Sequence, residues 1–171
     1  MKIYFPIAIA LTLCTLHAQI PASHIAEAKQ RYATIRDNLQ KAAEAMPEEN
    51  YAFKPTPEIR SFGELIAHVA DAQMAICGGA AGQPKKGTAA GKTAKADLLA
   101  ALKESSAGCD AIIDGTTEAN AATPVNMGGP KASRLGMLEY NTVHDSEEYG
   151  YLAVYLRLKG IVPPTSAGRG R

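Results

Sequence analysis

Four stretches of this chain place apolar residues at alternating steps of three and four, the spacing that lines them up along one face of an α-helix. The clearest stretch follows Ser23 and stops at Pro47, with apolar or small residues at Ile25, Ala28, Tyr32, Ile35, Leu39, Ala42 and Met46. No stretch carries a convincing strand pattern. Helices with one apolar face bury it against one another, so the sequence predicts an all-α four-helix bundle.

The other three helices are predicted from the same spacing together with helix-starting residues. Ser61 followed by Glu64 is a capping-box pattern, and it opens a helix over about residues 61–77. A third helix is predicted over 93–112 and a fourth over 133–159. The fourth is the least polar, with apolar residues at Leu135, Met137, Leu138, Tyr140, Val143, Tyr151, Val154, Tyr155 and Leu158.

The N-terminal segment 1–18 is predicted to be a signal peptide. It has one lysine, an apolar run from Ile3 to about Leu16 and a small residue ahead of the polar Gln19. A membrane anchor is the alternative, but the run is shorter than the roughly 20 apolar residues that span a bilayer. A lipoprotein is disfavoured, because Cys14 follows a leucine instead of a small residue. We therefore expect a periplasmic or secreted protein that is not membrane-bound once the signal is removed.

The remaining chain is expected to form one domain over 22–166, followed by a flexible tail over 167–171. The sequence has 18 basic and 17 acidic residues, and removal of the leader brings the net charge close to zero. Its lysines are scattered and form no basic stripe, so we do not expect a nucleic-acid partner. The expected partners are a small-molecule substrate and a second copy of the chain, as a homodimer.

Two histidines fall in the middle of predicted helices, His68 in the second and His144 in the fourth. Glu148 lies one helical turn after His144 and therefore projects from the same face. Two imidazoles and one carboxylate suit a borderline divalent metal such as zinc, nickel, manganese or iron. The alternative is that each histidine is structural and donates a hydrogen bond to a neighbouring helix.

Three segments together resemble the DinB-like superfamily of four-helix proteins, in particular its secreted bacterial members. They are MPEENYAFKPTPEIRSF, FGELIAHVADAQ and VHDSEEYGYLAVYLRLKGIVPP, and the resemblance covers about residues 22–166 in order. In that family the metal ligands are one histidine on the second helix and an H-x-x-x-H pair on the fourth. The resemblance thus implies that His68 and His144 are ligands, while Glu148 replaces the third histidine and departs from the family pattern.

The resemblance also implies an activity and a topology. Metal-dependent members point to a thiol-dependent transferase or isomerase, with a non-catalytic small-molecule-binding or homodimerising module as the alternative. The family has a crossover that makes the second and third helices parallel. The 15-residue connection GGAAGQPKKGTAAGK fits such a crossover, since a helix of about 17 residues spans roughly 25 Å and an extended chain easily reaches that far.

Further residues are expected to support this site or the fold. Glu64 and Asp71 lie about one turn to either side of His68, and one of them is expected to hold its second ring nitrogen. Tyr140 and Tyr151 are candidate pocket residues, with core packing as the alternative.

Parallel second and third helices would place Cys77 and Cys109 at the same end of the bundle. We therefore expect a disulfide between these two cysteines, and the alternative is a pair of buried free thiols.

Overall fold

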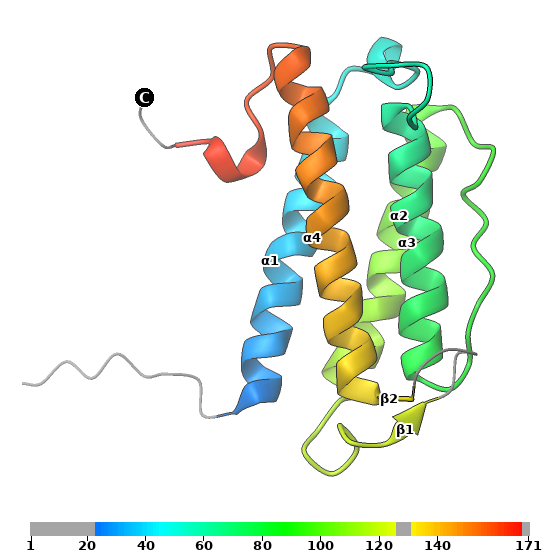
Figure 1. The fold of residues 1–171 in the computed structure, drawn as a ribbon, viewed down its shortest axis with the longest axis vertical. Coiled ribbons are helices and arrows are strands. Elements are labelled where there is room, and N and C mark those ends of the chain that lie inside the picture. Colours follow the sequence, from blue (N-terminus) through cyan, green and yellow to red (C-terminus); the bar gives the residue numbers. More distant parts are fainter. Residues whose placement is uncertain (1–22, 126–130, 169–171) are drawn as a thin grey trace, which may run out of the picture.

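The computed structural model describes residues 23–125 and 131–168, and these form the predicted all-α four-helix bundle (Figure 1). The helices are α1 (His24–Ala45), α2 (Phe62–Ala80), α3 (Lys95–Asp114) and α4 (Arg134–Leu158), with short 3-10 helices at Glu48–Asn50 and Pro164–Ser166. The predicted signal segment 1–18 lies outside the described residues, as do residues 169–171 of the predicted tail. No helix in the described part of the chain combines the length and apolar character needed to cross a bilayer.

Serine side chains begin three of the four helices. The Ser23 hydroxyl accepts a hydrogen bond from the Ala26 amide, and the Ser133 hydroxyl accepts one from the Gly136 amide. At α2 the bonds are reciprocal, because the Glu64 carboxylate also accepts from the Ser61 amide at 2.6 Å. These caps satisfy amides that have no partner within the first turn of a helix, which explains why the helices begin where the sequence predicted.

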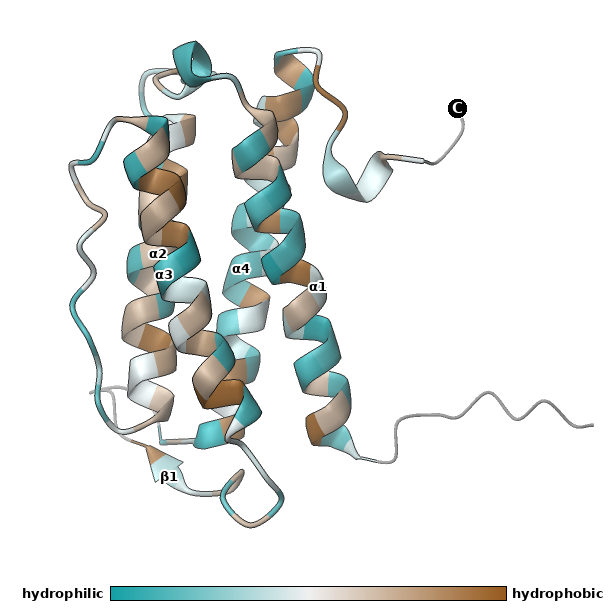
Figure 2. Cartoon of the chain, turned by 180° about the vertical axis from the view of Figure 1, so that it is seen from behind, coloured by the Kyte–Doolittle hydropathy of each residue, from teal (hydrophilic) through white to brown (hydrophobic). Residues whose placement is uncertain are grey.

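The helices α2 and α3 run in the same direction, as the family resemblance implied. In Figure 1 the connection between them climbs along the outside of the bundle from the end of α2 to the start of α3. Asp71 holds this connection, because its carboxylate accepts hydrogen bonds from the backbone amides of Ala89 and Ala90 at 2.8 and 3.0 Å. Most of the connection is pale or hydrophilic in Figure 2, and Ala89 within it is buried in the core.

The core fills the space between the helices, and a disulfide closes one end of it. Cys77 on α2 is bonded to Cys109 on α3 with their Cα atoms 5.3 Å apart, which confirms the predicted pair. Only parallel helices allow this pairing, because both cysteines lie toward the C-terminal ends of their helices. The largest fully buried apolar side chains come from all four helices and include Tyr32, Leu39, Phe62, Ile66, Leu98, Leu102, Leu152 and Leu156.

Two features differ from the sequence-based expectation. A two-stranded antiparallel ladder pairs Pro124–Val125 with Ala132–Ser133, and strands of two residues are too short to show an alternating pattern. The apolar residues of α4 also fall on two faces, where we had expected a single stripe. One face packs inside the bundle, and the other is exposed at Tyr140, Val143, Tyr151, Val154 and Leu158.

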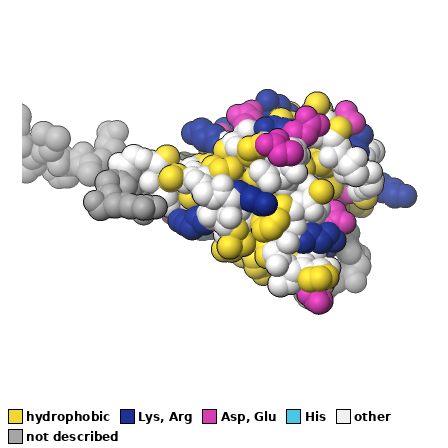
Figure 3. Space-filling model, turned by 90° about the horizontal axis from the view of Figure 1, so that it is seen from above, with side chains coloured by type: hydrophobic (Ala, Val, Ile, Leu, Met, Phe, Trp, Pro, Cys, Tyr) yellow, Lys and Arg dark blue, Asp and Glu magenta, His cyan; other side chains and the backbone are white. Residues whose placement is uncertain are grey.

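Charges of both signs are mixed on the end of the bundle that Figure 3 shows. Lysine and arginine side chains lie beside aspartate and glutamate side chains there, with hydrophobic atoms between them. Neither sign dominates this face.

Replacing Gly87 with alanine should lower the free energy of unfolding by about 1 to 3 kcal/mol. A Cβ atom at this position would overlap the Asp71 carboxylate, which would have to leave the amides it holds. Gly108→Ala is the matched control, because nothing lies within 4 Å of its Cβ position and alanine favours a helix by up to about 1 kcal/mol. Urea unfolding measures both variants, and equal shifts of the same sign would contradict the prediction.

Candidate metal site

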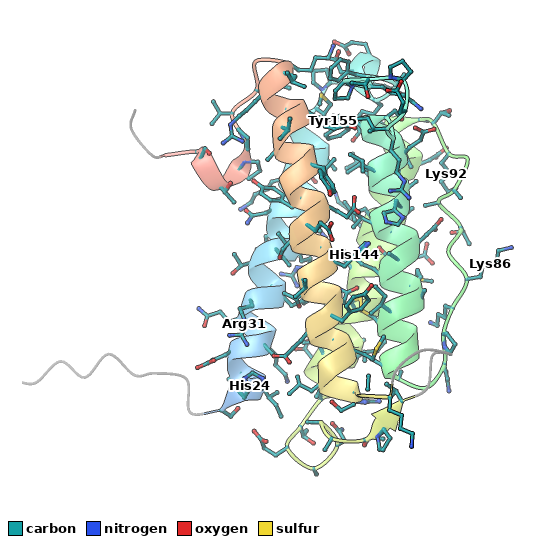
Figure 4. All side chains as sticks on the ribbon, in the orientation of Figure 1. His24, Arg31, Lys86, Lys92, His144 and Tyr155 are labelled. Atoms are coloured by element: carbon teal, nitrogen blue, oxygen red, sulfur yellow. A yellow bond between two sulfur atoms is a disulfide. The ribbon has the colours of Figure 1, made fainter. Side chains whose placement is uncertain are left out.

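The three predicted ligands meet where α4 passes α2. His68 comes from the middle of α2, and His144 and Glu148 come from one face of α4; Figure 4 labels His144 at this crossing. The Nε2 atoms of the two imidazoles are 3.2 Å apart. The Glu148 Oε1 atom lies 3.4 Å from His68 Nε2 and 3.9 Å from His144 Nε2.

These three distances are those expected between neighbouring ligand atoms of one metal ion. The point equidistant from the three atoms lies about 2 Å from each of them, which matches the length of zinc–nitrogen and zinc–carboxylate bonds. Two imidazoles and a carboxylate form a donor set that borderline divalent metals accept. The residues therefore fit a metal ion without rearrangement.

Burial leaves polar atoms around the site without partners. Glu148 Oε2 and His144 Nδ1 are both buried, and neither forms a hydrogen bond within the described residues. The Glu148 side chain is 7% exposed and has no lysine or arginine among its ion-pair partners in that part of the chain. Burying a carboxylate without a compensating cation costs free energy, so a bound cation would stabilise this site.

The two histidines differ in how readily they take up a proton. Burial, and then the nearby positive charge of Arg60, lower the pKa of His68. The Asp145 carboxylate, 3.8 Å from His144 Nδ1, raises the pKa of His144. In the metal-free protein His144 therefore takes up a proton more readily than His68.

Asp145 is the residue that the sequence analysis missed. It lies next to His144 in the chain but is fully buried, and its Oδ2 atom accepts hydrogen bonds from Gln73 and Asn141, both at 2.9 Å. Ser105 on α3 donates in turn to the Gln73 side-chain oxygen Oε1 at 2.8 Å. Burial raises the pKa of the Asp145 carboxyl. The chain of contacts ties α4 to α2 and α3 next to the candidate ligand His144.

One signal in the sequence could have revealed Asp145. It lies four residues after Asn141 and seven before Leu152, so all three occupy the inner face of α4, where buried residues are expected. Asp145 and Glu147 are both acidic and both lie between His144 and Glu148 in the chain. Position on the helix, and not residue type, separates the two, because Glu147 points outward.

The structure gives other partners to the two carboxylates that we expected beside His68. Glu64 accepts from the Ser61 amide and pairs with Lys54 at 3.1 Å. Asp71 holds the connection as described above. Within the described residues no hydrogen bond joins either carboxylate to His68, because both point toward backbone amides that need an acceptor.

Glu64 provides a pH-dependent contribution to stability. The Ser61 amide and Lys54 lower the pKa of Glu64 from its ordinary value of 4.5 to about 2. A lowered pKa stabilises the fold above the ordinary value, and the contribution disappears as the pH falls toward 2.

Glu64→Gln should therefore be less stable than the parent protein by under about 1 kcal/mol at neutral pH, since the side chain is exposed. Denaturant unfolding between pH 7 and pH 2 should show the two proteins converging. Lys54→Gln should keep most of the pH dependence, because the Ser61 amide is the larger cause. A constant difference across this range would disprove the assignment.

Two grooves lie beside the ligands and share Arg60. The tyrosine groove, of about 590 Å³, is lined by Glu58, Ile59, Arg60, Leu65, Tyr151 and Tyr155. The connection groove, of about 330 Å³, is lined by Arg60, Glu64, Ala67, His68, Asp71, Ala90, Gly91, Lys92 and Thr93. Of the predicted pocket residues, Tyr151 lines the first groove, whereas Tyr140 is exposed and is not among the lining residues of either groove.

The sequence model of one protein family matches most of this bundle. The family is the DinB superfamily, and its model matches residues 31–152, a stretch that includes all three candidate ligands. The chain belongs to the DinB superfamily. No curated protein sequence matches it. The superfamily assignment agrees with the resemblance of the three segments quoted from the sequence.

Solved DinB-like structures share the fold. A DinB-like protein from Bacillus cereus has a TM-score of 0.72 and 15% identity, covering 82% of this chain and 95% of its own. A DinB-like protein from Bacillus subtilis has a TM-score of 0.64 and 22% identity, covering 78% and 92%. A conserved protein from Enterococcus faecalis has a TM-score of 0.64 and 15% identity, covering 80% and 96%. At these identities the likeness describes the DinB-like fold alone.

Proposed function

We propose that this DinB-superfamily protein binds one divalent metal ion through His68, His144 and Glu148 and acts on a small molecule outside the cytoplasm. The main support for this proposal is that the three ligand atoms, from two helices, surround a common point at metal-bonding distance. The N-terminal pattern of residues 1–18 supports a periplasmic or secreted location and membership of a secreted subgroup.

A metal ion bound there would hold a thiol or water and lower its pKa, as such ions do in metalloenzymes. The protein's own groups would orient the site and handle the proton. The Glu148 Oε1 atom faces the two imidazoles, while the buried Oε2 atom has no partner among the described residues and can accept a proton from the incoming group. The Asp145 carboxylate lies 3.8 Å from His144 Nδ1, so its negative charge favours a proton on that nitrogen and leaves Nε2 to face the metal.

The substrate would enter along the connection groove, where His68 is about a third exposed. Arg60 borders both grooves, and its guanidinium forms no ion pair within the described residues, so it can bind an acidic group of the substrate. Relationship to the DinB superfamily favours a thiol-dependent transfer or an isomerisation as the reaction. The order of events is substrate anchoring at Arg60 followed by proton transfer to Glu148.

Elemental analysis of protein purified without a histidine tag tests the metal site. After exposure to zinc, nickel or manganese and removal of free metal, we expect about one ion per chain in the parent protein and none in His144→Ala. His24→Ala is the matched control, because His24 is an exposed histidine on α1 that pairs with Glu139. Substoichiometric metal in the parent, or equal metal in His144→Ala, would overturn the proposal.

A second candidate is a non-catalytic module with a degenerate metal site. The observation that favours it is Glu148, which stands where the family pattern has a third histidine. Such a module would bind a small molecule or its own copy and leave the two histidines in direct contact with each other. Glu148→His distinguishes the candidates: it should gain metal binding only if the parent site is degenerate.

A further inference from the structure

The tyrosine groove lies one helical turn away from the candidate metal ligands. On α2, Leu65 lines this groove and precedes His68 by three residues. On α4, Tyr151 lines it and follows Glu148 by three residues, and Tyr155, labelled in Figure 4, lies one turn further along the helix. Residues three or four apart project from the same side of a helix. The groove is therefore a continuation of the α2–α4 contact that holds the ligands.

The lining of the tyrosine groove is mostly apolar and open to solvent. Ile59 and Tyr151 are among the few large apolar side chains that are exposed within the described residues, at 42% and 49%. Leu65 and Tyr155 complete the apolar lining. The volume of about 590 Å³ lies within the roughly 300 to 1,000 Å³ of small-molecule sites, which are typically lined by apolar and aromatic side chains. The groove thus has the size and the lining of a site for the apolar part of a small molecule.

Tyr155 fixes the shape of this groove. Its hydroxyl donates a hydrogen bond to the backbone carbonyl of Arg60 at 2.6 Å. Its ring packs against Phe53 and Phe62, with ring centroids 6.0 and 6.4 Å apart. These contacts join the loop that carries Arg60 to α4, so the groove is formed before a ligand arrives. A preformed site loses less free energy on binding than one that must first be ordered.

A single positive charge borders the tyrosine groove. Arg60 is the only lysine or arginine in its lining, and the guanidinium forms no ion pair within the described part of the chain. Glu58 is the one acidic lining residue; its own backbone amide and the Thr56 side chain lower the pKa of its carboxyl, which places this carboxylate beside its own loop. A guanidinium binds a carboxylate through two parallel N–H···O bonds. One unpaired cation matches one negative charge, so the groove favours a carboxylate over a phosphate group, which carries up to about two.

We propose that the tyrosine groove holds the ring of an aromatic monocarboxylic acid whose carboxylate binds Arg60. The Tyr151 hydroxyl already donates to Glu147 at 3.3 Å, which leaves its ring as the part available to a ligand, and aromatic rings pack favourably on one another. Arg60 also borders the connection groove, where His68 lies, so the bound carboxylate lies between the ring and the metal site. The acid is a substrate of that site, a role that rests on the proposed function, and its reacting group lies close to the carboxylate.

Calorimetric titration with 2-naphthoate tests this assignment on protein freed of metal with a chelator, so that the acid cannot bind through an ion. We expect 2-naphthoate to bind the parent protein, and Arg60→Gln to weaken binding at least about tenfold by removing the charge-assisted pair. Tyr151→Ser should also weaken it, by about fivefold or more, because apolar contact is lost. Acetate, which lacks the ring, and 2-naphthylmethanol, which lacks the charge, should each bind at least about tenfold more weakly than 2-naphthoate.

Lys92→Gln is the matched control. Lys92 borders the connection groove but not the tyrosine groove, so its replacement should leave the affinity for 2-naphthoate unchanged. Thermal unfolding should be the same in all three variants, since the replaced side chains are exposed. A parent protein that does not bind 2-naphthoate at millimolar concentration would overturn the proposal. Weaker binding in Lys92→Gln together with unchanged binding in Tyr151→Ser would overturn it too, because the acid would then lie in the connection groove.

His144→Ala separates this inference from the proposed metal function. This variant is expected to lose the metal ion but to bind 2-naphthoate as the parent does, because His144 does not line the tyrosine groove. Metal uptake by the parent without binding of 2-naphthoate would overturn the acid site and leave the metal site standing. Binding of 2-naphthoate by a parent protein that takes up no metal would support the acid site and overturn the metal function.

Discussion

Replacing Cys77 and Cys109 together with alanine should lower the free energy of unfolding by about 3 to 4 kcal/mol in the entropic model. The bond closes a loop between residues 32 positions apart, and that loop contains the whole connection from α2 to α3. Without it the unfolded chain gains conformational freedom, while the folded bundle loses the covalent tie at one end. Urea unfolding under oxidising conditions measures the change.

Reduction supplies the control for this prediction. The parent protein unfolded in the presence of a thiol reductant should match the double alanine variant, and the variant itself should not respond to the reductant. In a Cys14→Ser background, thiol titration of the denatured, unreduced protein should find no free thiol. Two reactive thiols per chain, or equal stability with and without reductant, would contradict the prediction.

Saturating zinc should raise the free energy of unfolding by about 2.7 kcal/mol when its free concentration is a hundred times its dissociation constant. The reason is that the three ligand atoms are brought together only in the folded chain, where α2 crosses α4. Thermal or urea unfolding with and without zinc measures this gain. A chelator should abolish it, and the readout does not depend on any enzymatic activity.

Variants of the ligands make the measurement specific. Glu148→Ala should remove most of the gain, because the two remaining imidazoles bind an ion more weakly than the complete set. Glu147→Ala is the matched control, since this neighbouring carboxylate points outward and contacts Tyr151. A gain of similar size in both variants would place the ion elsewhere on the protein.

Local signals in the sequence were enough to predict the helices. Ser23, Ser61 and Ser133 begin helices in the structure because each hydroxyl accepts from a first-turn amide, an interaction that involves only neighbouring residues. The ligands were also predictable, since His144 and Glu148 share a face of any helix that contains them. Their meeting with His68 was a hypothesis that rested on the predicted bundle and then on the family resemblance, because spacing within one helix carries no information about another.

The partners of polar side chains were harder to predict. Glu64 and Asp71 lie about one turn from His68, yet their hydrogen bonds go to backbone amides at the start of α2 and in the connection. Asp145 is fully buried, although aspartate is a residue type found mostly at the surface. These outcomes depend on which chain segments pack against each carboxylate. An unpaired backbone amide competes with the His68 imidazole as a hydrogen-bond donor.

The sequence by itself therefore determined the four helices, the serine caps at Ser23 and Ser61, and the residue types available for a metal site. Tertiary structure alone decided which face of α4 turns inward, what Asp145 touches and which carboxylates remain without a partner. The physical reason is the distance along the chain over which each interaction acts. Capping and helical periodicity act within about one or two helical turns, whereas burial and hydrogen bonding to another helix depend on how all four helices pack.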